Sequence, residues 1–289
     1  MIEEFQKSYS VNLLCRTFGV HRSSYRHWAK RSKAVDSARI KLKALVKENF
    51  NKSEGSAGAR TIASLITNDK SNDVELNRYH AGKLMKELDL QSRQPCGHKY
   101  KKATKPHDCI ENLLNREFSP IAPNQVWCGD VTYLWTGNCW SYLAVVLDLY
   151  GRKVVGYAIS NSPDSELTKR ALRNAFESRG RPKGVMFHSD QGCHYTSESF
   201  RETLCSYKIK QSMSRRGNCW DNAPMERFFR SLKSENMPKK GYRNQAMAEQ
   251  RIKKYINKYY NFERPHAHNE SLSPVQKEQY YWKTSKRLA

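Results

Sequence analysis

The sequence lacks the features that define several common classes of protein. None of its 8 cysteines forms a CxxC pair, which argues against a zinc knuckle and favours reduced, mostly structural thiols. No apolar run approaches the roughly 18 residues that cross a bilayer, and the opening MIEEFQKSYS has no apolar signal segment. These absences predict a cytoplasmic protein without a membrane partner. The length of 289 residues suits about two domains.

Acidic residues are also scarce. Aspartate and glutamate number 28 against 51 lysines and arginines, so the formal net charge is +23. Such an excess does not specify a fold, but it predicts strong attraction to polyanions, of which nucleic acid is the usual one. Because no membrane segment is present, DNA or RNA is the favoured partner.

Residues 11–31 have the pattern of a helix-turn-helix with Gly19 at the tight turn. The second helix would then present Arg22, Arg26 and Lys30 to the major groove. The positions where such a motif needs small or apolar contacts are Leu14, Cys15, Phe18, Val20, Tyr25 and Trp28. A helical hairpin with a merely solvated basic face stays open as the alternative. We assign residues 1–50 to this domain.

A second helical DNA-binding region is predicted over residues 51–96. GARTIASLI forms one helix, and Asn77 can cap the next, NRYHAGKLMKELDL. Residues 97–120 then read as a basic linker, in which Lys101 and Lys102 are candidates for phosphate contacts. A solvated linker without a DNA contact is the alternative.

From residue 121 the sequence turns β-rich. QVWCGDVTYL, YLAVVLDLY and KVVGYAIS predict a three-stranded antiparallel meander. A helix, a strand, a helix, a short strand and a further helix follow, at 164–180, 184–190, 196–207, 209–214 and 214–235. The order βββαβαβα is that of the ribonuclease H-like fold, an α/β architecture with a mixed five-stranded sheet and flanking helices. The predicted catalytic domain covers 121–240, preceded by the all-α region, and 241–289 form a C-terminal helical extension.

Three acids occupy comparable places in these elements. Asp130 lies within the first strand, on the face opposite Trp127, Val131 and Tyr133, whose side can form core. Asp190 ends the fourth strand. Glu226 begins a helix that Asp221 or Asn222 can cap and that buries Met225, Phe228, Phe229 and Leu232. Glu235 is rotated to the opposite side of that helix.

Clustered carboxylates suit Mg²⁺ or Mn²⁺, hard cations that prefer oxygen ligands. Two such ions can activate an attacking oxygen and stabilise a leaving one without a covalent protein nucleophile. Each acid alone has a structural interpretation: a backbone contact for Asp130, a turn for Asp190 and a pair with Arg230 for Glu226. Their joint order favours the metal site. His188, two positions before Asp190, is a candidate for support by hydrogen bonding, whereas Asp148 has a structural interpretation.

The blocks WCGDVTYL, HSDQGCHYTS and DNAPMERFFRSLKSE resemble the three catalytic blocks of the DDE transposase and integrase superfamily. Between Asp190 and Glu226 lie 35 residues, 191 to 225, the interval that this superfamily prefers. KLMKELDL and the tail YINKYYNFERPHAHNESLSP resemble the insertion-sequence-three family, whose OrfB-type product has a retroviral-integrase-like catalytic core. The likeness runs from about residue 10 to 280.

This resemblance implies divalent-metal-dependent DNA cleavage by water, followed by attack of the freed 3′-OH on another phosphodiester. Asp130, Asp190 and Glu226 would hold the ions. The basic residues of the same helix would contact DNA near the scissile bond; they are Arg227, Arg230 and Lys233. The expected partners are double-stranded DNA of the element's terminal repeats and of the target, and further copies of the chain in a homodimer or larger assembly. The expected location is a bacterial cytoplasm, at the nucleoid.

Two departures from the family pattern stand out. SAGARTI replaces the Tyr-Gly-Tyr-Arg-like run that relatives carry, and no heptad run is long enough for a leucine zipper. The chain is therefore either the downstream product of a frameshift pair, with an upstream partner product, or is expressed differently. Two other function classes stay open: a non-catalytic DNA-binding regulator, and a ribonuclease H-like nuclease that cuts without joining.

Overall fold

The computed structural model describes residues 1–30, 36–93 and 110–285. These residues form two compact units, Met1–Leu42 and Lys43–Ala289. Lys101 and Lys102, the predicted phosphate contacts of the linker, lie outside the described residues. No helix in the described ranges is both long and apolar enough to cross a membrane.

The first unit contains the predicted helix pair. Its helices α1, α2 and α3 span Ile2–Phe5, Val11–Thr17 and Arg22–Ala29. Gly19 lies between α2 and α3 with φ +61°, a left-handed conformation that glycine adopts without strain, so the predicted turn is confirmed. Leu14, Cys15 and Tyr25 are buried as expected.

Three of the predicted apolar contacts of this motif are wrong. Phe18, Val20 and Trp28 are exposed, with Trp28 at 48%. A unit of such short helices has too little interior to cover every large side chain. Tyr25 takes most of the available space, stacks on Trp28 at a centroid distance of 5.9 Å and donates a hydrogen bond to Gln6.

Helix α4, Ser37–Lys52, leads into the second helical region, which contains α5, Ala59–Asn68, and α6, Arg78–Glu87. The Asn77 side chain accepts a hydrogen bond from the His80 amide at 2.9 Å, which confirms the predicted helix cap. Helices α5 and α6 pack through buried residues at helical spacing: Ile62, Ala63, Ile66, Ala81, Leu84 and Met85.

The strands of the described residues build one mixed sheet in the order β3-β2-β1-β4-β5. The predicted meander is confirmed, because β1 pairs antiparallel with β2 and β2 antiparallel with β3. Strands β4 and β5 add in parallel beside β1. The strand bounds are Val126–Trp135, Trp140–Asp148, Lys153–Ser160, Met186–Ser189 and Lys210–Met213.

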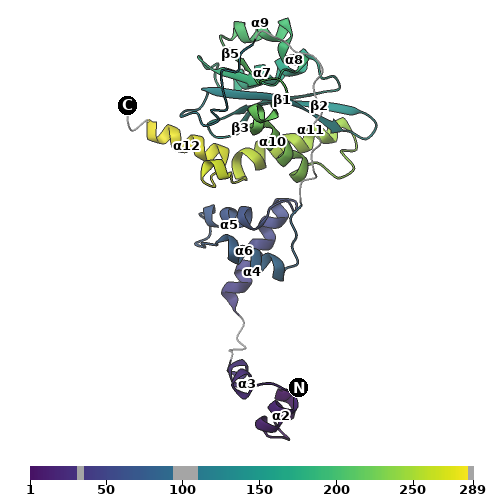
Figure 1. Cartoon of the computed structure of the whole chain (residues 1–289), viewed down its shortest axis with the longest axis vertical. Helices are drawn as coiled ribbons and strands as arrows, with labels where there is room; N and C mark the ends of the chain where they lie inside the picture. Colours follow the sequence, from purple (N-terminus) through teal and green to yellow (C-terminus); the bar gives the residue numbers. More distant parts are fainter. Residues whose placement is uncertain (31–35, 94–109, 286–289) are drawn as a thin grey trace. The chain divides into compact units, whose positions relative to one another are not determined.

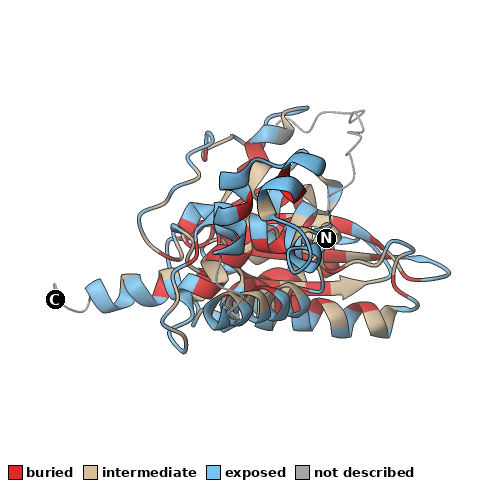
Figure 2. Cartoon of the chain, turned by 90° about the horizontal axis from the view of Figure 1, so that it is seen from below, coloured by how far each residue is buried: buried red, intermediate tan, exposed pale blue. Residues whose placement is uncertain are grey.

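Helices cover both faces of this sheet (Figure 1). On one face lie α7, α8 and α9, which span Ser165–Ser178, Cys193–Thr196 and Glu198–Ser206. On the other lie α10, Ala223–Glu235, and α11, Gln245–Lys254. Buried residues follow the strands between these layers (Figure 2).

Strand β1 contributes side chains to the hydrophobic core on each face of the sheet, because its side chains alternate between the two faces. Trp127 joins the core under α7 and α9, whereas Cys128 and Leu134 join the core under α10 and α11. Tyr133 lies past the end of its core and is 56% exposed, so the prediction that it packs inside is wrong. Asp130 therefore points to the α10 face, in the middle of a buried strand.

Gly156 on β3 lets α7 approach the sheet. A Cβ at this position would lie 2.4 Å from the Ala171 oxygen and 2.5 Å from the Ala175 nitrogen, both backbone atoms of α7. Since backbone cannot rotate away, we expect Gly156→Ala to lower the free energy of unfolding by about 3 kcal/mol or more. Chemical denaturation measures this. Gly82→Ala is the control, because its Cβ would meet Ala59 at an ordinary 3.6 Å. An unchanged midpoint for Gly156→Ala would contradict the packing.

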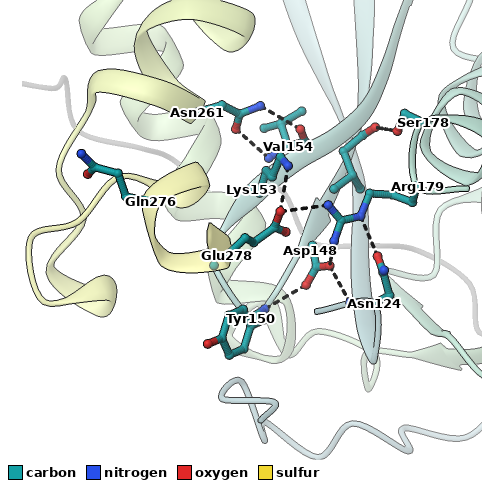
Figure 3. Close-up of polar contacts among 12 residues, drawn as sticks. Asn124, Asp148, Tyr150, Lys153, Val154, Ser178, Arg179, Asn261, Gln276 and Glu278 are labelled. Carbon is teal, nitrogen blue, oxygen red and sulfur yellow. Dashed lines mark hydrogen bonds and ion pairs between the residues drawn. The ribbon is translucent and has the colours of Figure 1, made fainter. Parts of the chain in front are cut away.

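The C-terminal extension packs on the α10 face and edge of the sheet. Helix α11 continues as a π-helical segment, η2, Tyr255–Glu263, and the short η3, Ala267–Asn269, precedes α12, Pro274–Ser285. The Asn261 amide both accepts from and donates to the Val154 backbone, at 3.0 and 2.9 Å, and so extends the hydrogen bonding of β3 (Figure 3).

A buried ionic network fixes α12 to the same body (Figure 3). Arg179 reaches Glu278 at 2.9 Å and Asp148 at 3.5 Å, and Glu278 also accepts from Lys153. Asp148 further accepts from the amides of Asn124 and Tyr150. Burial raises the pKa of Asp148 to about 6, and its oxygens are taken up by these donors. Asp148 is a structural acid, as its sequence position suggested.

Candidate active site

Asp130 and Asp190 are placed side by side by the register of two parallel strands. Strand β1 pairs with β4 from Val126 opposite Met186 to Gly129 opposite Ser189. One position further on, Asp130 lies on β1 and Asp190 follows the last residue of β4. Neighbouring strands are roughly 4.8 Å apart, so the two carboxyl groups lie next to each other at the point where β4 ends.

Gly129 and Gly192 make room for these two acids. A Cβ on Gly129 would lie 2.3 Å from the Phe187 ring, so only glycine lets that ring fill the core beneath Asp130. The Asp130 carboxylate accepts from the Val131 amide at 2.7 Å. The Asp190 carboxylate accepts from the Gly192 amide at 3.1 Å, which fixes the turn after β4.

Helix α10 brings the third acid to the same region. The predicted apolar stripe is confirmed, since Met225, Phe228, Phe229 and Leu232 are buried against the sheet. Glu226 is half-buried beside this stripe, in the first turn of the helix. Glu235 is held elsewhere by Arg264 and Tyr255, as its position on the far side of the helix predicted.

The expected helix cap is wrong in an informative way. Asn222 occupies the cap position of α10, but its side chain accepts no hydrogen bond from the helix. Its amide instead donates to the Gly129 carbonyl at 3.2 Å. Because Gly129 precedes Asp130, this bond attaches the start of the glutamate-bearing helix to the aspartate-bearing strand.

Asp221 does not cap the helix either. Its fully buried carboxylate accepts from Arg215 at 3.0 Å, from Arg116 at 2.6 Å and from Asn112 at 2.9 Å. Hydrogen bonds from Arg215, followed by those from Arg116, hold the pKa of Asp221 well below its usual range. Asp221 is thus the ionised anchor of the short segment η1, Cys219–Asn222, that leads into α10.

The acids interact electrostatically. Burial, then the charges of Asp190 and Glu226, raise the pKa of Asp130 well above its usual range, while the Val131 amide and Lys233 oppose the rise. Burial lowers the pKa of Lys233, and Asp130 partly counteracts it. Asp190, Glu226 and Lys233 therefore all lie within electrostatic reach of Asp130, at a point where the buried strand opens toward solvent.

The oxygen-only donor set fits a hard divalent cation. A cation placed among the acids would offset the repulsion of Asp130 by the Asp190 and Glu226 carboxylates. Within the ranges that the structure describes, no three His, Cys, Asp or Glu side chains are already drawn together as metal ligands. Because like charges repel, we expect the three carboxylates to approach one another when an ion binds between them.

The predicted DNA-binding residues divide between the units. Arg227 and Arg230 are exposed on α10, and Lys233 is half-buried. In the first unit Arg22 and Arg26 are exposed on α3, and Lys30 is exposed just after it. Their contacts with DNA remain predictions.

His188 makes its hydrogen bonds away from the acids. The ring is fully buried, and its nitrogens contact the Ser212 and Ser214 hydroxyls at 2.9 and 3.1 Å. Burial lowers its pKa to about 4, so the ring is neutral at physiological pH. Any support that it gives the site passes through the pairing of β4 with β5, and this role stays a prediction.

Two contacts near the site were not predicted from the sequence. The Cβ that Gly192 lacks would lie 2.8 Å from the His194 ring, and Asp190 counteracts the burial that lowers the pKa of His194. Arg116 contacts Asp221 across 105 positions, a distance at which no local signal exists. Tyr260 and His266, in the C-terminal extension, are buried and pack against each other, so neither ring is available to stack on DNA.

Comparisons with known proteins agree with this arrangement. Residues 120–219 and 207–274 match two families, each described as "Integrase core domain". These matches cover the mixed five-stranded sheet and define the class: a polynucleotidyl transferase of the transposase and integrase type.

The family follows from the relatives. The chain is 32% identical over 281 residues to "Transposase InsF for insertion sequence IS3A" of Escherichia coli K12, covering 95% of this chain and 96% of that protein. It is 52% identical over 159 residues to "Putative transposase InsO for insertion sequence element IS911B" of the same organism, covering 55% and 79%. The chain belongs to the insertion-sequence-three family of DDE transposases.

One solved structure with a similar backbone is the HTLV-2 integrase catalytic core domain in complex with magnesium. It is 22% identical, with a TM-score of 0.40, and the match covers 55% of this chain and 98% of that one.

Proposed function

We propose that this chain is the transposase of an insertion sequence, which cuts DNA at the element's ends and joins the freed 3′-OH to a second phosphodiester. The observation that carries the proposal is the β1–β4 register, which puts Asp130 and Asp190 on adjacent parallel strands. The bond from Asn222 to the Gly129 carbonyl brings the helix of Glu226 to the same place. Membership of the transposase family supports the reaction class.

In this mechanism Asp130, Asp190 and Glu226 would hold Mg²⁺ or Mn²⁺ through carboxylate oxygens. Such an ion, when bound, activates an attacking oxygen and stabilises the leaving one. The Gly192 amide orients Asp190, and the Val131 amide orients Asp130. Lys233 and the exposed Arg230 and Arg227 hold the phosphates on either side of the scissile bond.

Strand joining separates this proposal from the alternatives. A duplex that carries the element's own end is incubated with the full chain and Mg²⁺ or Mn²⁺. A transposase yields both the cut strand and a joined product. Cutting without joining would indicate a nuclease, and neither product, with DNA still bound, would indicate a regulator.

We also propose that residues 1–50 and 51–96 bind the terminal repeats, that 121–240 form the catalytic domain and that 241–289 extend it. Joining two ends requires two active sites, so the working form would be a homodimer or larger assembly on DNA. An upstream frameshift product is a further candidate partner. Size measurement with and without paired DNA ends tests the assembly.

The exposed arginines of α3 lead to a separate prediction. Arg22 and Arg26 lie one turn apart on the exposed face of α3. The double variant Arg22→Ala, Arg26→Ala should weaken binding to the element's ends and reduce the salt slope of log K by roughly 1 per lost phosphate contact. Fluorescence anisotropy across a salt series measures both. Arg173→Ala, which removes an exposed arginine from α7, is the control. An unchanged slope in the double variant would remove α3 from the interface.

A further inference from the structure

Trp220 is a large aromatic side chain exposed just before the helix that carries Glu226. It lies in η1, the segment that leads into α10, and is 67% exposed. An exposed indole contributes nothing to the core and costs free energy in water. Among its neighbours, Met225, Phe228 and Phe229 are buried. The position of Trp220 therefore calls for an explanation other than packing.

Arg116 holds the indole on one side. Its guanidinium carbon lies 5.8 Å from the Trp220 ring centroid, in a cation–π arrangement. The same guanidinium donates to Asp221 at 2.6 Å and to Asn218 at 3.2 Å. One face of the ring is thus in contact with a positioned planar cation, and much of the ring remains accessible.

Arg116 is itself held in a strained turn. Asn115 and Arg116 both have positive φ, 43° and 65°, a conformation that side chains other than glycine adopt at a cost. Two contacts keep the turn in place: Asn112 accepts from the Asn115 amide, and Leu114, buried in the core, donates to Ser212. The strain persists because the surrounding structure fixes the turn on both sides.

The charge around the indole is positive. Asp221 is the shared acceptor of Arg116 and Arg215, so two arginines share one buried carboxylate. The Arg215 side chain is 52% exposed and that of Arg116 38% exposed. The N–H groups of these two arginines that do not already donate to Asp221 or Asn218 can donate to phosphate oxygens. An exposed ring beside exposed guanidinium groups matches a nucleotide, which offers both a flat base and an anion.

A few residues of the chain and one hydrogen bond connect Trp220 to Glu226 and Asp130. Trp220 is two residues from Asn222, a separation of at most about 7 Å along the chain. Asn222 donates to the carbonyl of Gly129, the neighbour of Asp130. Glu226 follows four positions later on α10. A nucleotide on the indole would therefore lie at or next to the scissile phosphate.

We propose that Trp220 stacks on an unpaired base at the DNA end and so positions the strand whose phosphodiester reacts, with Arg116 holding the indole and Arg215 facing the phosphate. Trp220 is a positioning residue in this proposal, which rests on the proposed function. A base inside the duplex is stacked on both faces, so the proposed occupant is an unpaired base at the strand end. Stacking does not depend on which base is present, because every base has a π-face.

The test compares two forms of one DNA with the full-length chain. The first is a blunt duplex, and the second is the same duplex with one strand end unpaired and 2-aminopurine at the last position. Anisotropy in Ca²⁺ buffer gives affinity, and 2-aminopurine fluorescence reports stacking. The wild type should prefer the unpaired end and quench the probe. Trp220→Ala should bind the unpaired end roughly 5- to 150-fold more weakly, with affinity for the blunt duplex unchanged.

Two further variants make the result specific. Trp220→Phe keeps a ring and should keep most of the preference and part of the quenching. Trp282→Ala removes a 46% exposed indole from α12 and should behave like the wild type. If Trp220→Ala keeps both the preference and the quenching, the stacking proposal is wrong. Equal weakening on both DNA forms would show a general contact and would also overturn it.

The stacking proposal and the proposed function can fail separately. The strand-joining assay on the wild type tests the function without reference to Trp220. If the wild type joins DNA and Trp220→Ala retains its preference for the unpaired end, only the stacking proposal fails. If no joining occurs with either metal, the function fails, whatever the binding data show.

Discussion

Glu226→Gln should abolish both DNA cutting and strand joining while leaving DNA binding nearly intact. The substitution removes one carboxylate from the acidic group and leaves every basic residue of α10 in place. Because changing a group that only supports a metal ligand costs about 10- to 100-fold, loss of a ligand itself should cost more than about 100-fold in rate. Gel analysis of cut and joined products with Mg²⁺ and Mn²⁺ measures the effect.

The control for this result is Glu202→Gln, the same chemical change at an exposed position of α9. It should cut and join as the wild type does. Retained cutting by Glu226→Gln, or loss of DNA binding in parallel with activity, would show that Glu226 acts as a surface ion pair and not at the reacting phosphate.

Glu235→Gln, on the same helix as Glu226, should destabilise the fold. Arg264 donates to the Glu235 carboxylate from Nε at 2.9 Å and from Nη2 at 2.7 Å, and the Tyr255 hydroxyl donates at 2.7 Å. The two charged side chains are only 20% and 13% exposed. Breaking such a pair leaves a buried charge without its partner, at a cost of about 3–5 kcal/mol. Chemical denaturation followed by circular dichroism measures the loss.

Glu177→Gln is the matched control for stability. Its partner Arg181 lies one turn away on the surface, with side chains 50% and 69% exposed, so the change should stay within about 1 kcal/mol. If Glu235→Gln and Glu177→Gln shift the denaturation midpoint equally, the Glu235–Arg264 pair is not what attaches η2 to α10.

Local patterns were enough to predict the strands, the apolar stripe of α10 and the cap at Asn77, because each depends on neighbouring residues. The pairing of β1 with β4, which brings Asp130 beside Asp190, followed only from the resemblance to a known order of elements.

Contacts between distant segments could not be predicted. The interval from Arg116 to Asp221 is 105 positions, and nothing in either local sequence indicates that the two residues meet. Asn222 has the composition of a helix cap, yet tertiary structure directs its amide to the Gly129 carbonyl. Likewise Phe18 and Trp28 match a packed motif, but their unit has too little interior to bury them.

Anomalous diffraction from crystals grown with Mn²⁺ and a pre-cut DNA end tests the central claim most directly, because it locates the ions independently of activity. We expect anomalous density among the carboxylates of Asp130, Asp190 and Glu226, in contact with the terminal phosphate. Density at another group of side chains, with these three acids left without an ion beside the bound DNA end, would contradict the account.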